Sequence, residues 1–310
     1  MPEASQGEPA PPAASRTPID ERLQKSLDRA LYASGSPRAQ KVRNFLNGVW
    51  LGEPLHAILT DIPTGAWSLA ALCDLVEAAA GDRRFGFAAD LCLTVGLAGA
   101  AAAAASGLAD WFDVDPPARR TGLYHGLLNL GAMGLYTASL VVRKKKLRGK
   151  GRLCAAAGFC AMAVASRLGG DMVYKHRIGV DRTSGEEFPE KFTAVLAASR
   201  LPEDTLARAD YKGVPIVLVR RGERVFAISG TCSHAGAPLI EGKLKGNSVE
   251  CPWHSSRFCL ESGRVLDGPA VHSQPCLEAR AHYGQIEVRT MPRRPRRRNI
   301  EAGRADPVHA

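Results

Sequence analysis

Two long stretches without a charged side chain constrain this sequence more than any other feature. Residues 91–109 cover 19 positions and residues 121–142 cover 22, and neither stretch contains Asp, Glu, Lys or Arg. A helix needs ~20 apolar residues to cross the hydrocarbon core of a bilayer. The two stretches therefore predict membrane-spanning helices. A soluble, Ala-rich helical bundle is the alternative, and it is disfavoured because soluble helices seldom lack charge over such lengths.

Two neighbouring segments extend this pattern. Residues 55–80 are apolar but carry several acidic side chains, and residues 153–174 are interrupted by Arg167. Each segment can span a membrane only if its charged side chains face the interior of the helix bundle. We therefore expect residues 51–182 to form an all-α domain of four membrane-spanning helices.

The two ends of the chain carry no apolar pattern. Residues 1–18 are rich in Pro, Ala and Ser, and residues 292–310 are basic and interrupted by Pro, so both are predicted to be disordered. Residues 19–50 begin with apolar residues at helical spacing and predict an amphipathic helical lead-in. The net charge of +10 is concentrated in short runs rather than on a broad face, which argues against a nucleic-acid partner.

The second half of the chain has a different character. Residues 190–291 alternate short β-branched runs with turns and predict an all-β domain. Within it, Cys232 and His234 are separated by one residue, Cys251 and His254 by two, and 16 residues lie between the two pairs. Two Cys–His pairs could hold zinc as Cys₂His₂. They could also hold a [2Fe–2S] cluster, with two cysteines on one iron and two histidines on the other. Spacing alone leaves both possibilities open.

The sequence around these pairs resembles the Rieske ferredoxin family. The resemblance rests on Cys-Ser-His-Ala-Gly-Ala-Pro-Leu at 232–239, on Cys-Pro-Trp-His at 251–254, and on Gly-Pro-Ala at 268–270. It implies that a [2Fe–2S] cluster is bound by Cys232, His234, Cys251 and His254, and that the domain carries single electrons. The chain leaves no space after this domain for the catalytic iron domain of a Rieske oxygenase, so we expect an electron-transfer component rather than a stand-alone catalyst.

Departures from the family bear on the reduction potential. Respiratory Rieske proteins have a disulfide where this chain has Ala237 and Trp253, and a tyrosine where it has Phe258. Ser256 matches a position where they place a hydroxyl donor to the cluster. Hydrogen bonds to the cluster sulfurs raise the reduction potential. We therefore expect this domain to resemble the ferredoxins rather than the respiratory Rieske proteins, and to have a low reduction potential. Ser255 replaces a common glycine, which predicts either an altered loop or a non-glycine residue at positive φ.

The first half resembles an uncharacterised bacterial four-helix membrane domain that also occurs fused to Rieske modules. The resemblance includes Gly-Glu-Pro-Leu-His at 52–56, Leu-Thr-Asp-Ile-Pro-Thr-Gly-Ala-Trp at 59–67 and Gly-Leu-Ala-Asp-Trp at 107–111. It implies a four-helix bundle but no activity. The family often has histidine where this chain has Glu53 and Asp171.

Four spans would bring several ionisable residues to one membrane face. The candidates for a haem b or quinone site are His56, Asp61, His125 and His176. A cluster of hydrogen-bonded helix caps is the plainer alternative. We predict a membrane-anchored electron carrier whose partner is a redox protein or a quinone, with membrane lipid around it. The alternatives are a quinol- or haem-linked oxidoreductase component and a redox sensor.

The expected location is a bacterial inner membrane, crossed several times. Residues 143–152 hold seven Lys and Arg, and short basic loops stay in the cytoplasm. This favours an extracytoplasmic Rieske domain, although basic residues also flank the opposite membrane face. The sequence does not predict the oligomeric state.

Overall fold

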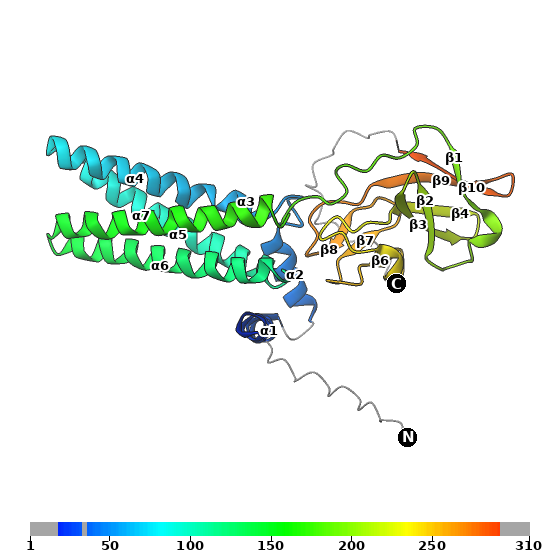
Figure 1. The fold of residues 1–310 in the computed structure, drawn as a ribbon, viewed down its shortest axis with the longest axis horizontal. Helices are drawn as coiled ribbons and strands as arrows, with labels where there is room; N and C mark the ends of the chain where they lie inside the picture. The colour runs from blue at the N-terminus through cyan, green and yellow to red at the C-terminus, as the bar shows by residue number, and fades with distance from the viewer. Residues whose placement is uncertain (1–17, 33–35, 292–310) are drawn as a thin grey trace, which may run out of the picture.

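The structure is a computed structural model that describes residues 18–32 and 36–291. It is elongated, with long helices at one end and the β domain at the other (Figure 1). Apart from Pro18, the segments predicted to be disordered, 1–18 and 292–310, lie outside the described residues.

The helical half is a bundle of long helices that run side by side (Figure 1). A short helix, α3 (Leu55–Leu59), leads into α4 (Asp61–Ala80), and α5 (Arg83–Trp111), α6 (Ala118–Lys144) and α7 (Arg148–Tyr174) follow. α4 packs along α5, and α6 packs along α7. The connections between partners are short, so the bundle consists of two antiparallel helix pairs.

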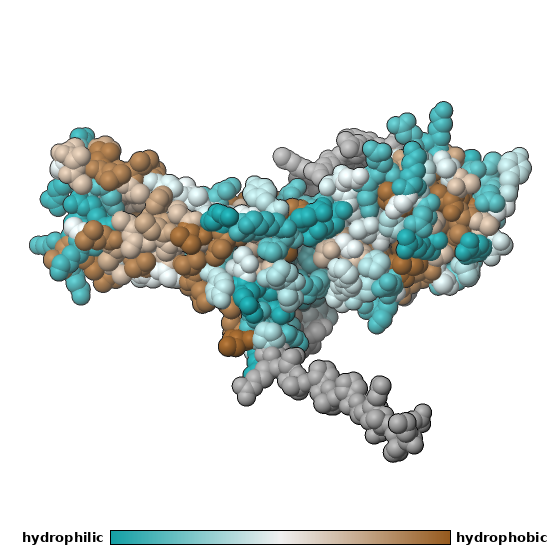
Figure 2. Space-filling model, viewed as in Figure 1, coloured by the Kyte–Doolittle hydropathy of each residue, from teal (hydrophilic) through white to brown (hydrophobic). Residues whose placement is uncertain are grey.

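Three of these helices, α5, α6 and α7, are long and apolar enough to cross a membrane. Only 17–33% of their most apolar windows is buried inside the molecule, so apolar side chains cover much of the outer surface of the bundle (Figure 2). α4 does not reach the same apolarity, because it carries Asp74 and Glu77. Both side chains are buried and face the bundle interior, as a spanning segment requires. The four-span count therefore stays a prediction.

The β domain contains two antiparallel sheets. The strands are β1 (Thr193–Ala197), β2 (Ala207–Tyr211), β3 (Val214–Arg221), β4 (Arg224–Ser229), β5 (Lys243–Lys245), β6 (Ser248–Glu250), β7 (Arg257–Cys259), β8 (Val265–Asp267), β9 (Cys276–His282) and β10 (Gln285–Thr290). The larger sheet has the strand order β1-β10-β9-β4-β3-β2 and the smaller β5-β6-β7-β8. β3 and β4 form a hairpin, with Val219 opposite Phe226.

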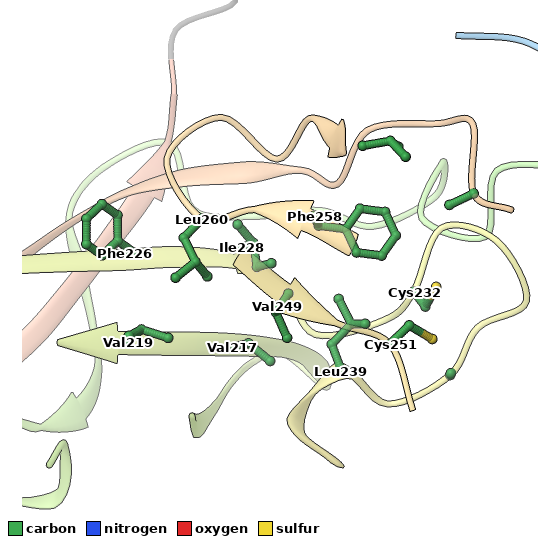
Figure 3. Close-up of a cluster of buried hydrophobic side chains, with 13 residues drawn as sticks. Val217, Val219, Phe226, Ile228, Cys232, Leu239, Val249, Cys251, Phe258 and Leu260 are labelled. Atoms are coloured by element: carbon green, nitrogen blue, oxygen red, sulfur yellow. The ribbon is translucent and has the colours of Figure 1, made fainter. Parts of the chain in front are cut away.

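The core between the sheets explains where the metal ligands lie. Fully buried side chains from β3, β4 and β6, among them Val217, Ile228 and Val249, pack against Phe258 of β7. Cys232 and Cys251 lie side by side at one end of this core (Figure 3). The chain leaves β4 and β6 at that end, so the two segments that follow form adjacent loops.

The lead-in is divided into two helices, α1 (Ile19–Tyr32) and α2 (Pro37–Asn47). The Ser36 side chain accepts a hydrogen bond from the Ala39 N–H, and Pro37 occupies the first turn, a combination that starts a new helix. α2 lies between the two halves of the molecule. Asn44 donates to Asp267 and accepts from the Gly268 N–H of the β domain, whereas Asn47 donates to Asp110 at the end of α5.

Candidate metal centre

The four predicted ligands lie on two loops of matching conformation. In the first loop, the Cys232 N–H donates to the Ala237 carbonyl and the Gly236 N–H donates back to the Cys232 carbonyl. In the second, the Cys251 N–H donates to Ser256 and the Ser255 N–H donates back to Cys251. Each loop therefore closes on itself over the same number of residues and presents one cysteine and one histidine.

The two loops also share a left-handed residue at the same step. Gly236 has φ +85° and Ser255 has φ +59°. Glycine adopts this conformation without strain, whereas a residue with a side chain adopts it rarely. Of the two alternatives predicted for Ser255, an altered loop or a non-glycine residue at positive φ, the structure has the second.

The donor atoms are arranged as two pairs. The imidazoles of His234 and His254 have ring centres 5.1 Å apart and nearly perpendicular planes, and the Nδ1 atom of each is buried without a hydrogen-bond partner among the described residues. The side chains of Cys232 and Cys251 are buried and lie side by side (Figure 3). Unpaired buried nitrogens are costly unless a ligand uses them, so these atoms fit a metal centre.

The same geometry bears on the two alternatives that spacing left open. In the described part of the chain, no three His, Cys, Asp or Glu residues are grouped closely enough to hold one metal ion. A single zinc ion needs four ligands around one point. A [2Fe–2S] cluster needs two ligands at each of two irons, which is what two separated pairs provide.

The electrostatics of the loops suit metal ligands. Burial lowers the pKa of His234 to about 3, and the neighbouring His254 adds to the effect, so the imidazole is neutral. The adjacent Cys232 side chain and the N–H groups of Trp253 and His254 lower the pKa of Cys251 to about 7, whereas the same pairing with Cys251 and burial raise the pKa of Cys232. Neutral imidazole and thiolate are the forms that bind metal.

The predicted tuning residues surround the ligands. Ser256 is fully buried, and its hydroxyl oxygen accepts a hydrogen bond of 2.9 Å from the Ala270 N–H. Phe258 is fully buried and brings no polar group to its position. The Trp253 side chain is 53% exposed beside the second histidine. Their influence on the potential stays a prediction.

The histidine side of the site faces the helical half. His254 Nε2 lies 3.5 Å from a carboxylate oxygen of Asp115, which belongs to the loop between α5 and α6. The Arg182 N–H donates to the Ser233 carbonyl. A cavity of about 230 Å³ lies at this contact and is lined by His234 and Trp253 on one side and by Asp110 on the other. The sequence carried no signal for these contacts, because they depend on how the two halves dock.

The four candidates in the membrane domain are only partly brought together. His56 on α3 and His125 on α6 have ring centres 6.3 Å apart. His176 lies after α7 and lines the cavity beside the ligand loops. Asp61 is exposed at the start of α4. A haem or quinone site built from these residues would therefore centre on the two paired histidines.

Two further cysteines of the β domain lie on strands rather than on the ligand loops, Cys259 at the end of β7 and Cys276 at the start of β9. The Cys276 thiol is directed at the carbonyls of Leu260 and Glu261, and burial raises its pKa to about 11. All eight cysteines are free. A thiol with a raised pKa, such as that of Cys276, is a poor metal ligand.

Comparisons with known proteins agree with this site. Residues 191–280 match the Rieske [2Fe-2S] domain family, and residues 52–182 match a family described as Predicted membrane protein (DUF2231). The chain is 32% identical over 95 residues to Ferredoxin CarAc of Metapseudomonas resinovorans, which covers 30% of this chain and 89% of that protein. It is 41% identical over 89 residues to the 3-phenylpropionate/cinnamic acid dioxygenase ferredoxin subunit of Escherichia coli K12. This match covers 28% of this chain and 83% of that subunit.

A solved structure, the ferredoxin of carbazole 1,9a-dioxygenase from Nocardioides aromaticivorans IC177, is 28% identical and covers 33% of this chain and all of that one, with a TM-score of 0.31. The family match and the ferredoxin relatives define the β domain as an iron–sulfur domain of the electron-transfer class. The chain belongs to the Rieske [2Fe-2S] family through residues 191–280, and residues 52–182 match the DUF2231 family.

Proposed function

We propose that this protein is a membrane-anchored Rieske-type electron carrier that passes single electrons between redox proteins. One observation carries the proposal: two matched loops present two cysteines side by side and two histidines with free Nδ1 atoms. Cys232 and Cys251 would hold one iron, and His234 and His254 the other. A bound cluster would supply a one-electron couple, and neutral imidazoles would raise its potential relative to an all-cysteine cluster.

The chain's own residues perform three tasks in this proposal. The closed loops keep the ligand positions fixed before the cluster binds. The N–H groups of Trp253 and His254, which lower the pKa of Cys251, stabilise negative charge on sulfur. The core around Phe258 excludes water from one side of the cluster.

The partner is proposed by analogy with the relatives. Both named relatives are ferredoxins, and the Escherichia coli protein is named as a dioxygenase subunit. A redox protein of the oxygenase or reductase type is therefore the partner we favour. A quinone partner, the membrane lipid environment and the redox-sensor alternative rest on the membrane domain alone.

The metal content of the purified protein tests the proposal. We expect two irons and two acid-labile sulfides per chain, and no zinc. Cys232→Ala and Cys251→Ala should lose the cluster, whereas Cys259→Ala, matched in chemistry but outside the site, should retain it. Stoichiometric zinc without iron would overturn the proposal.

We also propose that the protein lies in a bacterial inner membrane with the Rieske domain outside the cytoplasm. The loop between α6 and α7 lies at the end of the bundle away from the β domain (Figure 1). α6 ends at Lys144, and the loop itself carries Lys145 and Lys146; short basic loops stay cytoplasmic. A cysteine introduced at Lys145, in a chain without accessible native thiols, should resist a membrane-impermeant thiol reagent on intact cells. Labelling there would reverse the orientation.

A further inference from the structure

The membrane domain contains an internal repeat that the helix pairs make visible. Residues of α3 and α4 face residues of α6 that lie 69 positions later. Trp67 stacks on Tyr136 with ring centres 4.2 Å apart, and Asp74 forms an ion pair with Arg143. His56 and His125 are the third pair with this spacing. The two helix pairs are therefore related by an approximate two-fold axis, and side chains on that axis meet their own counterparts.

The partner helices repeat as well, with a spacing of 62 positions. An added Cβ at Gly96 of α5 would meet the Trp67 ring at 2.2 Å, and one at Gly158 of α7 would meet the Tyr136 ring at 3.2 Å. Each glycine thus makes room for the aromatic ring of its own helix pair. The repeat therefore extends to the packing of side chains.

The histidine pair has the same symmetry, and each ring is held by its own helix pair. His56 Nδ1 donates to the Ala103 carbonyl of α5 at 2.8 Å. His125 Nδ1 donates to the Ala165 carbonyl of α7 at 2.8 Å. Ala103 and Ala165 again lie 62 positions apart. A carbonyl only accepts, so each Nδ1 carries the proton and each Nε2 is unprotonated, with a lone pair that can bind a metal or accept a hydrogen bond. Metal-binding histidines are commonly fixed in this way by a backbone carbonyl on the other nitrogen.

Two glycines leave space at the rings. A Cβ at Gly107 of α5 would lie 2.7 Å from the His56 ring, and one at Gly169 of α7 would lie 3.2 Å from the His125 ring. These glycines are also 62 positions apart. Because these positions lack a Cβ, the His56 ring lies directly against the backbone of α5 and the His125 ring directly against that of α7.

The separation of the rings indicates what could lie between them. With a metal–nitrogen bond of ~2.0 Å and ~1.2 Å from nitrogen to ring centre, two imidazoles on opposite sides of one metal have centres ~6.4 Å apart. The observed separation is 6.3 Å. No third His, Cys, Asp or Glu is grouped with them in the described residues. A metal held here needs its remaining ligands from a cofactor, and a porphyrin supplies four in one plane.

We propose that His56 and His125 are the axial ligands of a b-type haem bound between the two helix pairs. In the structure, the Asn129 amide lies 3.2 Å from His125 Nε2. Haem binding would displace that contact, while Asn129 keeps its hydrogen bond to the His125 carbonyl. This proposal goes beyond the electron-carrier function and does not depend on it.

The pair of His56 and His125 lies at the end of the bundle that faces the cluster site. Gly107, against the His56 ring, lies three residues before Asp110, which lines the cavity next to His234. At ~1.5 Å of rise per residue, the two positions are ~5 Å apart along α5. The histidine edge of the Rieske site and the haem site thus lie at the same end of the bundle.

The test is spectroscopic and uses the full chain in detergent. After expression with added haem precursor, we expect one haem b per chain, with a Soret band and a low-spin ferric electron paramagnetic resonance signal. His56→Ala and His125→Ala should each abolish the low-spin signal. His176→Ala, which changes a histidine at the same end of the bundle, should retain the low-spin signal. Iron and sulfide at the Rieske site should be unchanged in all three variants, which shows that the protein is folded.

Two results would overturn the haem proposal. One is a wild-type protein with an intact cluster that shows no Soret band, even after titration with haemin. The other is unchanged low-spin haem in both His56→Ala and His125→Ala. Loss of the cluster with haem retained would count against the electron-carrier function alone, so the two proposals fail separately.

Discussion

Each ligand loop has one left-handed residue, and we predict that substitutions at these two positions change the thermal stability by different amounts. Gly236 has φ +85°, and an added Cβ would meet no heavy atom within 4 Å. Gly236→Ala therefore adds backbone strain without a steric clash. A left-handed residue with a side chain costs ~1–2 kcal/mol. For a domain of this size, 1 kcal/mol lowers the melting temperature by roughly 4–8 °C, so we expect a decrease of roughly 4–16 °C.

Ser255→Gly is the reciprocal change and should have a much smaller effect. It removes the same strain at φ +59°, but it also gives the unfolded chain more freedom, which costs ~0.4–1 kcal/mol. Because these contributions oppose each other, the net change should be a stabilisation of only ~0–1.6 kcal/mol. The two variants make opposite changes at the same step of the two loops.

The assay is thermal bleaching of the cluster absorption, recorded for the full chain at one scan rate. Gly263→Ala serves as a control for a steric clash, because its Cβ would lie 2.0 Å from the Gln274 carbonyl oxygen, and it should lose more stability than Gly236→Ala. If Gly236→Ala bleaches at the wild-type temperature, the argument from loop strain is wrong.

Three further changes test other contacts. The wild-type potential should lie nearer the ~−150 mV end of the Rieske range, and Phe258→Tyr should raise it modestly in protein-film voltammetry; a strongly positive wild-type value would contradict this. Asn44→Ala leaves the Gly268 N–H without its acceptor and should cost ~1–3 kcal/mol in denaturant unfolding, with Lys41→Ala at an exposed position of the same helix as control. Arg143→Ala leaves Asp74 buried without its partner and should cost ~3–5 kcal/mol of bundle stability in detergent, whereas equal stability would show that the pair is dispensable.

The sequence alone determined the parts of this protein that depend on residue type and local spacing. The ligand set could be predicted because Cys232, His234, Cys251 and His254 lie in two short sequence patterns, whose surroundings resemble the Rieske ferredoxins. A left-handed Ser255 was one of two alternatives that the sequence left open, and the structure adopts it. The apolar helices were evident because uncharged stretches of that length have few other uses in a folded chain.

Tertiary structure decided which distant residues meet. His56 and His125 are 69 positions apart, and only the packing of one helix pair against the other brings them together, while it leaves Asp61 exposed. Asp115 reaches His254 only because the end of the bundle docks against the ligand loops. Local patterns specify a helix face or a loop, but the choice among possible partners depends on the burial of whole surfaces, which no single segment of sequence contains.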